Sequence, residues 1–112
     1  DFLYTGDLVA AVLLALEKAP GGEVFQIASG RETSVNELIA TMRAVVPEAR
    51  FEMTHEPARR GEIIRNYSDI SKARRVLGYS PQTDLRTGLR KTWDWFQGNK
   101  EKILSLAEQK PA

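Results

Sequence analysis

Residues 57–62 read PARRGE, and their side chains suit the binding of a phosphorylated ligand. An arginine guanidinium offers a planar set of donors that fits two phosphate oxygens, and a carboxylate accepts hydrogen bonds from the paired hydroxyls of a ribose. Gly61 lets the backbone turn, so that Arg59 and Glu62 can face one ligand. By itself the hexapeptide is also typical of a solvated loop with surface ion pairs.

The remaining reactive residues do not assemble a catalytic set. The single histidine, His55, has Glu52 and Glu56 nearby, which falls far short of a metal-binding signature. The sequence has no glycine-rich phosphate loop and no tyrosine followed four positions later by lysine. We therefore expect no catalytic residue and no metal site in this chain.

The composition indicates one small domain without a strong electrostatic field. The 112 residues include 16 Lys and Arg against 15 Asp and Glu, a net charge of +1. This balance attracts neither nucleic acid nor an anionic membrane, so we expect neither as a partner. The absence of cysteine excludes disulfides and fits a cytoplasmic location. The longest apolar run, residues 8–16, is about half the length of a bilayer span.

Local patterns predict an α/β (α+β) lobe in which short strands alternate with three to four helices. Alternating apolar and polar residues predict strands at 1–4, 23–28, 50–56 and 63–67. Helical signals predict helices at 8–18, 34–46, 69–77 and from 84 onward. An interruption of the last helix is expected at Gly98 and Asn99, because both residues are poor helix formers.

Capping residues support the predicted helices. Ser34 is followed three residues later by Glu37, which is the spacing of a reciprocal capping box. Gly78 is expected to end the helix over 69–77 in the left-handed conformation. The carboxylates or hydroxyls expected to cap the other helices belong to Asp7, to Asp69, and to Asp84 or Thr83.

The first predicted helix contains more apolar surface than one face can bury. Residues 8–16, LVAAVLLAL, are apolar on all sides, and such a helix needs neighbours in nearly every direction. One interpretation is a small core rich in leucine and alanine. The other is that a further domain or subunit covers the second face. An uncovered face of this kind also favours self-association, so a homodimer is among the expected assemblies.

Five segments, in this order, resemble the C-terminal part of the extended short-chain dehydrogenase/reductase family, the NAD-dependent nucleotide-sugar epimerases and dehydratases. These segments are DFLYTGD, EVFQIASGRETSVNEL, PARRGE, SDISKARRVLGYSP and DLRTGLRKTWDWF. The resemblance covers about residues 1–97 and implies that they form the substrate-binding lobe of a Rossmann-type enzyme. Residues 98–112 then form a helical extension.

In that family the loop has the pattern P-x-R-x-G-[DE], which residues 57–62 match. The resemblance implies that Arg59 contacts the diphosphate, and Glu62 the ribose, of a UDP- or dTDP-sugar, as in a UDP-glucose 4-epimerase. Arg60 falls on a variable position. The resemblance further implies that NAD and the catalytic residues belong to an N-terminal Rossmann domain upstream of Asp1. The chain itself is then expected to bind no cofactor and to be inactive alone.

Two other interpretations stay open at this point. One is a lobe from a related NAD(P)-dependent reductase or dehydratase with a different substrate, which the residues upstream of Asp1 would distinguish. The other is an autonomous helical interaction module, for which PARRGE is only a solvated loop. Chemical shifts at the loop that depend on phosphate would separate this module from a nucleotide-binding lobe.

Overall fold

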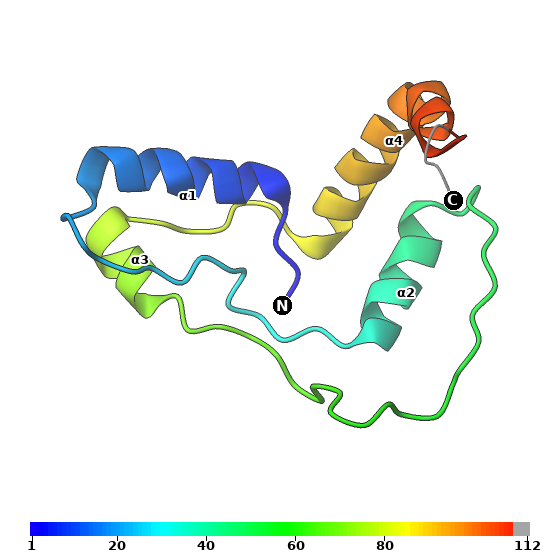
Figure 1. The fold of residues 1–112 in the computed structure, drawn as a ribbon, viewed down its shortest axis with the longest axis horizontal. Helices are drawn as coiled ribbons and strands as arrows, with labels where there is room; N and C mark the ends of the chain where they lie inside the picture. The colour runs from blue at the N-terminus through cyan, green and yellow to red at the C-terminus, as the bar shows by residue number, and fades with distance from the viewer. Residues whose placement is uncertain (109–112) are drawn as a thin grey trace.

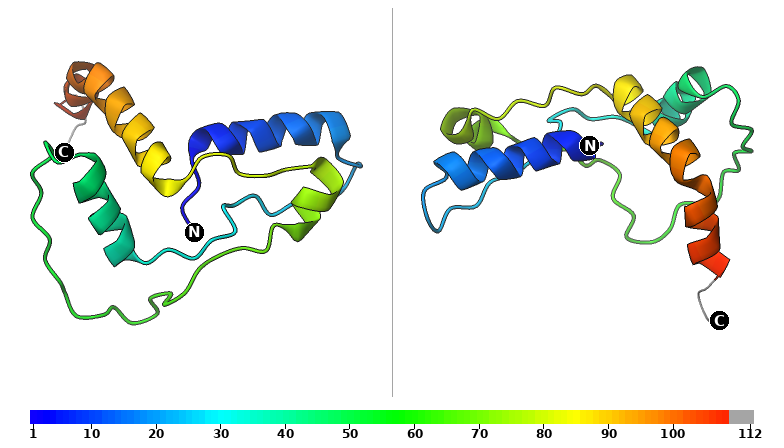
Figure 2. Two further views of the ribbon diagram at one scale, coloured as in Figure 1. Left: turned by 180° about the vertical axis from the view of Figure 1, so that it is seen from behind. Right: turned by 90° about the horizontal axis from the view of Figure 1, so that it is seen from above.

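The structure is a computed structural model that describes residues 1–108 and contains four α-helices (Figure 1). These are α1 (Thr5–Lys18), α2 (Val35–Val45), α3 (Ser71–Leu77) and α4 (Leu85–Glu108). Helix α1 packs against α3, and α2 packs against α4. Extended segments connect the two helix pairs, and a long connection from α2 to α3 bows away from both (Figures 1 and 2).

The predicted α/β fold class is wrong, because residues 1–108 contain no strand. The segments 1–4, 23–28, 50–56 and 63–67 belong to no strand and to no helix. Alternation of apolar and polar residues favours an extended backbone, but a strand also requires a neighbour with which to share hydrogen bonds. In this chain, side chains rather than a neighbouring strand bond several backbone groups of these segments.

Three side chains satisfy backbone groups of the extended segments. The carboxylate of Asp1 accepts from Ser29 N at 2.8 Å and from Gly30 N at 3.0 Å. Lys72 Nζ donates to the carbonyl of residue 24 at 2.8 Å, and Tyr79 Oη donates to the carbonyl of residue 28 at 2.9 Å. These side chains thus bond backbone groups that a strand would pair with a neighbouring strand.

The core lies between α1 and α3. Its buried members are Ala11, Ala28, Ile70, Ala73, Leu77 and Tyr79. Leu77 has no exposed surface, and Tyr79 is 2% exposed. Burial raises the pKa of the Tyr79 phenol, which therefore stays protonated and able to donate its hydrogen bond.

The second helix pair is held by a mixture of apolar and polar contacts. Within α4, Trp93 stacks on Phe96 with ring centroids 5.7 Å apart. The indole Nε1 of Trp93 donates to Glu48 Oε1 at 2.8 Å, which ties α4 to the turn after α2. Val45 and Val46, at the end of α2, are buried. Amphipathic faces of α2 and α4 therefore meet here.

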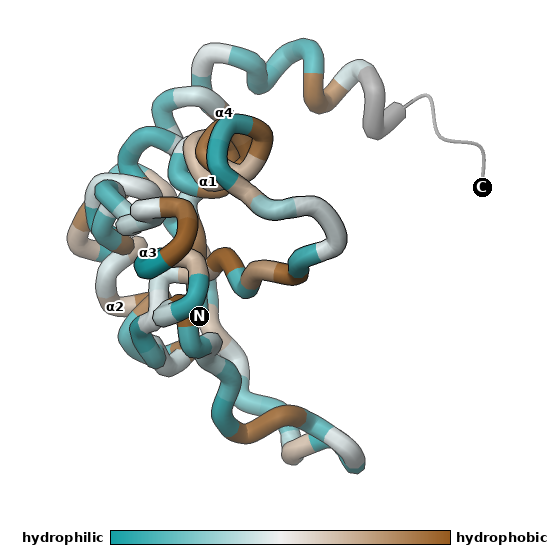
Figure 3. The backbone as a smooth tube through the Cα atoms, turned by 90° about the vertical axis from the view of Figure 1, so that its left-hand side faces the viewer, coloured by the Kyte–Doolittle hydropathy of each residue, from teal (hydrophilic) through white to brown (hydrophobic). Residues whose placement is uncertain are grey.

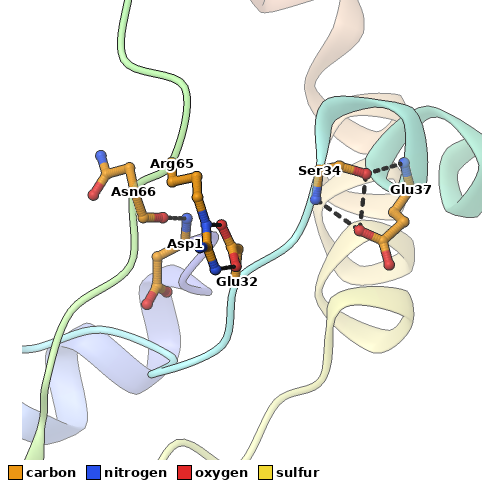
Figure 4. A network of polar contacts seen from close by, with 6 residues as sticks. All are labelled: Asp1, Glu32, Ser34, Glu37, Arg65 and Asn66. Carbon is orange, nitrogen blue, oxygen red and sulfur yellow. Dashed lines mark hydrogen bonds and ion pairs between the residues drawn. The ribbon is translucent and has the colours of Figure 1, made fainter.

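Most of the predicted caps are confirmed. Ser34 Oγ accepts from Glu37 N at 3.1 Å, and Glu37 Oε2 accepts from Ser34 N at 2.7 Å, which completes the capping box (Figure 4). Asp84 Oδ1 accepts from Thr87 N at 2.7 Å at the start of α4. Gly78 ends α3 with a φ of 71°, in the left-handed region that favours glycine.

The predicted cap at Asp7 is wrong. Helix α1 begins at Thr5, so Asp7 lies inside the first turn, where it is buried. Its Oδ2 accepts from Thr83 N at 2.9 Å, and its Oδ1 accepts from Thr83 Oγ1 at 3.3 Å. Asp7 therefore joins two distant segments instead of capping its own helix.

The predicted cap at Asp69 is also wrong, because the N-cap of α3 is Ile70 and no side chain caps this helix. Asp69 lies one residue before the N-cap and accepts from Ser71 N at 2.8 Å.

We expect Asp7→Ala to lower the free energy of unfolding by about 2 kcal/mol, because Thr83 N–H would lose its acceptor in a partly buried position. Urea unfolding of the full-length protein measures this loss. Asp7→Asn is the matched control, since its amide oxygen still accepts from Thr83 N, and it should cost less than about 1 kcal/mol. Equal losses in the two variants would contradict the assignment.

The cap of α4 predicts a pH-dependent contribution to stability. Hydrogen bonds from Thr87 lower the pKa of Asp84 below its ordinary value of 3.8. The contribution is therefore present above that ordinary value and is lost as the pH falls through the lower pKa of the folded state. Asp84→Asn keeps a capping side chain that does not titrate. The difference in melting temperature between the two proteins, measured by circular dichroism, should shrink from about pH 6 to about pH 3. A difference in melting temperature that stays constant with pH would contradict this role of the Asp84 carboxylate.

Helix α4 continues through Gly98 and Asn99, so the predicted interruption is wrong. The side chain of Asn99 donates to the carbonyl of Trp95 at 2.8 Å, one turn earlier, and so points back along the helix. A single glycine within a long helix costs about 1 kcal/mol, which the other turns of the helix can tolerate. The separate extension over 98–112 stays a prediction, and its residues 109–112 lie outside the described residues.

The outward face of α1 is uncovered. Exposed fractions on this face range from 44% at Leu8 to 80% at Leu16, and Val9, Val12 and Leu13 lie between these values. Figure 3 views α1 nearly end-on and shows hydrophobic colour on its turns. The small core thus covers one side of α1, as the second interpretation of its sequence requires. Among the described residues, no helix combines the length and hydropathy needed to cross a membrane.

Candidate functional site

The loop 57–62 folds into a tight turn on the long connection between α2 and α3 (Figure 1). Arg59 N donates to Glu62 Oε2 at 3.1 Å, and Glu62 N donates to the carbonyl of Arg59 at 3.2 Å. Gly61 has a φ of 86°, which is the backbone freedom that its position suggested. The structure therefore brings together Arg59 and Glu62, the two predicted site residues.

The charged groups of this turn face solvent. The side chain of Arg59 is 83% exposed, and its Nη2 lies 3.5 Å from Glu56 Oε2. Such an exposed pair is weak, so a phosphate with greater charge can replace Glu56 as the partner of Arg59. Arg60 is also exposed. The Glu62 carboxylate uses Oε2 in the turn, and its second oxygen can accept a further hydrogen bond.

The base of the loop is held by a bidentate ion pair that the sequence did not reveal. Arg65 Nε donates to Glu32 Oε1, and Arg65 Nη2 donates to Glu32 Oε2, both at 2.6 Å (Figure 4). These hydrogen bonds lower the pKa of Glu32 and raise that of Arg65, so both groups stay charged. The two residues are 33 positions apart, and no local pattern links them. The one indication in the sequence is that Glu32 lies in one of the five segments that resemble the family.

Asp1 fixes the neighbouring backbone. Its backbone nitrogen donates to the carbonyl of Asn66 at 2.8 Å (Figure 4), and its carboxylate accepts from Ser68 N at 3.4 Å. The same carboxylate accepts from Ser29 Oγ at 2.6 Å. Asp1 thus joins the end of the loop to the segment that leads into α2.

The two cavities described next are not lined by residues of the loop 57–62. One, of about 250 Å³, is lined by Arg31, Thr33 and Asp84 among others. Another, of about 570 Å³, lies between α1 and α4 beside Tyr4 and Trp95. Small-molecule sites usually bury most of their ligand, and the turn with Arg59 is too open to do so alone. A site that buries a nucleotide would therefore need further residues around this turn.

No metal centre is found within residues 1–108, where no three His, Asp or Glu side chains gather closely enough to hold an ion. His55 is exposed in the long connection between α2 and α3.

The chain belongs to the GDP-mannose 4,6 dehydratase family, whose sequence profile matches residues 1–92. It is 35% identical over 101 residues to the UDP-glucose 4-epimerase of Mycolicibacterium smegmatis, and this match covers 90% of the chain and 32% of that enzyme. The resemblance drawn from the five sequence segments is therefore confirmed at the level of the family.

Two solved structures have a similar fold. The UDP-glucose 4-epimerase of Thermotoga maritima, solved with UDP-glucose, is 35% identical with a TM-score of 0.79, and the match covers 88% of this chain and 31% of that one. The enzyme WbmF of Bordetella bronchiseptica, solved with NAD+ and UDP, is 29% identical with a TM-score of 0.80, and the match covers 97% and 32%. The chain thus spans about a third of the length of these relatives.

Proposed function

We propose that this chain forms the nucleotide-sugar-binding lobe of an NAD-dependent epimerase or dehydratase that acts on a UDP- or dTDP-sugar. Residues 1–97 form the lobe and residues 98–112 its helical extension. The observation that carries the proposal is the turn at 57–62, which presents Arg59 and Glu62 together in a chain of this family. Relatives solved with UDP or UDP-glucose support the choice of ligand class.

Arg59 and Glu62 divide the recognition of the nucleotide between them. The Arg59 guanidinium leaves Glu56 and donates to the diphosphate, where two parallel hydrogen bonds fix both position and orientation. Glu62 accepts from a ribose hydroxyl while its other oxygen holds the turn. Both contacts are remote from the sugar, so they bind substrate and transition state alike and leave the chemistry to other residues.

We infer that residues 1–108 do not form an NAD site. A dinucleotide pyrophosphate is typically bound by free amides at a helix N-terminus after a glycine-rich turn. At the starts of α2 and α4, the amides of Glu37 and Thr87 instead donate to Ser34 and Asp84 of the chain itself. We therefore place NAD, and the residues that oxidise the sugar, in the N-terminal part that makes up the rest of the relatives' length.

The uncovered face of α1 is the surface that this N-terminal part would cover. The radius of gyration is 17.4 Å, against about 13 Å for a self-contained domain of similar length. An extended chain whose first helix exposes Leu13 and Leu16 is typical of a lobe that packs against a larger domain. A homodimer through this face stays the competing prediction.

The test is an assay of the full-length protein with UDP-glucose, UDP-glucuronate and dTDP-glucose, each with NAD and followed by NMR of the sugar. The proposal predicts an epimerised or dehydrated sugar from at least one of them. Net reduction of a substrate at the expense of NAD(P)H would move the protein to the reductase branch. No binding of UDP or dTDP and no turnover would overturn the proposal and favour an interaction module.

A further inference from the structure

We propose that Glu32 and Arg65 are positioning residues that hold the nucleotide-binding loop in place. The inference rests on the proposed function, because it assigns a role in binding to residues that do not themselves touch the nucleotide. The pair joins the C-terminal side of the loop to the segment in front of α2 (Figure 4).

The loop has few other attachments. Every residue from 52 to 67 is exposed. The hydrogen bonds that the structure gives to residues 56–62 stay within that stretch, between Arg59 and either Glu56 or Glu62. Following the chain from the turn, Arg65 is the first residue bonded to another part of the molecule. The pair is therefore the nearest point at which the loop is fixed.

The geometry of the pair suits this role. Two parallel hydrogen bonds of 2.6 Å fix both the distance and the rotation of the guanidinium relative to the carboxylate. Glu32 lies two residues before Ser34, which the capping box fixes to α2. The loop is thus connected through Glu32 to the start of a regular helix, and Arg65 lies only three residues from Glu62.

The pair is better suited to positioning than to global stability. The side chain of Arg65 is 69% exposed and that of Glu32 is 39% exposed, and exposed ion pairs contribute little to the free energy of unfolding. Holding an exposed loop in place before the ligand arrives instead lowers the entropy lost on binding. The loss of the pair should therefore weaken substrate binding while the melting temperature hardly changes.

The test compares variants of the full-length enzyme in steady-state kinetics. We expect Arg65→Ala to raise KM for the nucleotide sugar about fivefold, with kcat within about twofold of the parent, because only binding is affected. Arg65→Lys should recover part of the loss, since an ammonium cannot make the two parallel bonds. The double variant Glu32→Arg with Arg65→Glu restores an ion pair and should recover KM to within about twofold.

Lys72→Ala is the matched control. It removes the surface ion pair between Lys72 Nζ on α3 and Glu23 Oε2 at 2.5 Å, together with the hydrogen bond from Lys72 to the carbonyl of residue 24, and both contacts lie outside the loop. This variant should leave KM unchanged. Equal effects of Lys72→Ala and Arg65→Ala, or a fall in kcat and melting temperature at Arg65 without a change in KM, would overturn the inference.

A readout without ligand separates this inference from the proposed function. We expect trypsin to cleave after Arg59 and Arg60 faster when the turn opens, because opening frees the backbone on both sides of these residues, and mass spectrometry follows both cleavages in the full-length protein. We expect Arg65→Ala to accelerate them severalfold and Lys72→Ala to leave them unchanged. If the enzyme binds no nucleotide sugar but Arg65→Ala accelerates cleavage, the proposed function fails and the positioning role stands. If Arg59→Ala raises KM while Arg65→Ala changes neither KM nor cleavage, the positioning role fails alone.

Discussion

Arg59→Ala in the full-length enzyme is expected to raise KM for a UDP- or dTDP-sugar by roughly 10- to 150-fold and to change kcat by less than about threefold. A hydrogen bond to a charged group contributes about 1.5–3 kcal/mol, which corresponds to this range of affinity. The proposed contact is remote from the reacting sugar, so we expect its loss to weaken binding of the ground state and the transition state equally and to appear in KM. Steady-state kinetics with the best substrate measures both constants.

Two further variants make the result specific to the guanidinium. Arg59→Lys should recover only part of the affinity, because an ammonium keeps the charge without the planar set of donors. Arg60→Ala is the control, since Arg60 is an exposed neighbour in the same turn, and it should change KM by less than about threefold. Equal effects at Arg59 and Arg60, or an unchanged KM in Arg59→Ala, would reduce the turn to an ordinary charged loop.

Leu77→Ala is expected to lower the free energy of unfolding by about 3 kcal/mol. Leu77 has no exposed surface and lies where α3 packs against α1, so its truncation removes buried apolar area and leaves a cavity. Urea unfolding of the full-length protein provides the measurement.

Leu104→Ala is the matched control for Leu77→Ala, because it makes the same substitution in a helix at a side chain that is 50% exposed. It should cost less than about 1 kcal/mol. A loss at Leu77 no larger than that at Leu104 would mean that the contact between α1 and α3 is not the core of this lobe.

Local chemistry predicted the local structure well. The capping box of Ser34 and Glu37, the left-handed Gly78 and the cap at Asp84 each depend on residues within a few positions of one another, and all are confirmed. The turn at Gly61 is of the same kind. Such features can be read from the sequence because the atoms that form them are already neighbours along the chain.

Features that join distant segments were not predicted. The expected strands are absent from residues 1–108 because alternation does not specify a pairing partner. Asp7 has the chemistry of a cap, yet it accepts from Thr83, 76 positions away. Glu32 and Arg65 likewise meet only in the folded chain. The roles of Arg59 and Glu62 came from the family resemblance and stay predictions.

The most direct test of the central claim, that the turn at 57–62 holds the nucleotide, is an NMR titration of the full-length protein with UDP and with dTDP. We predict saturable shifts of the amides of Arg59, Gly61 and Glu62 with at least one of the two, while the amide of Lys72 on α3 stays unchanged. Arg59→Ala should weaken the titration about tenfold or more. Saturable shifts elsewhere in the protein with none at these three amides would contradict the claim.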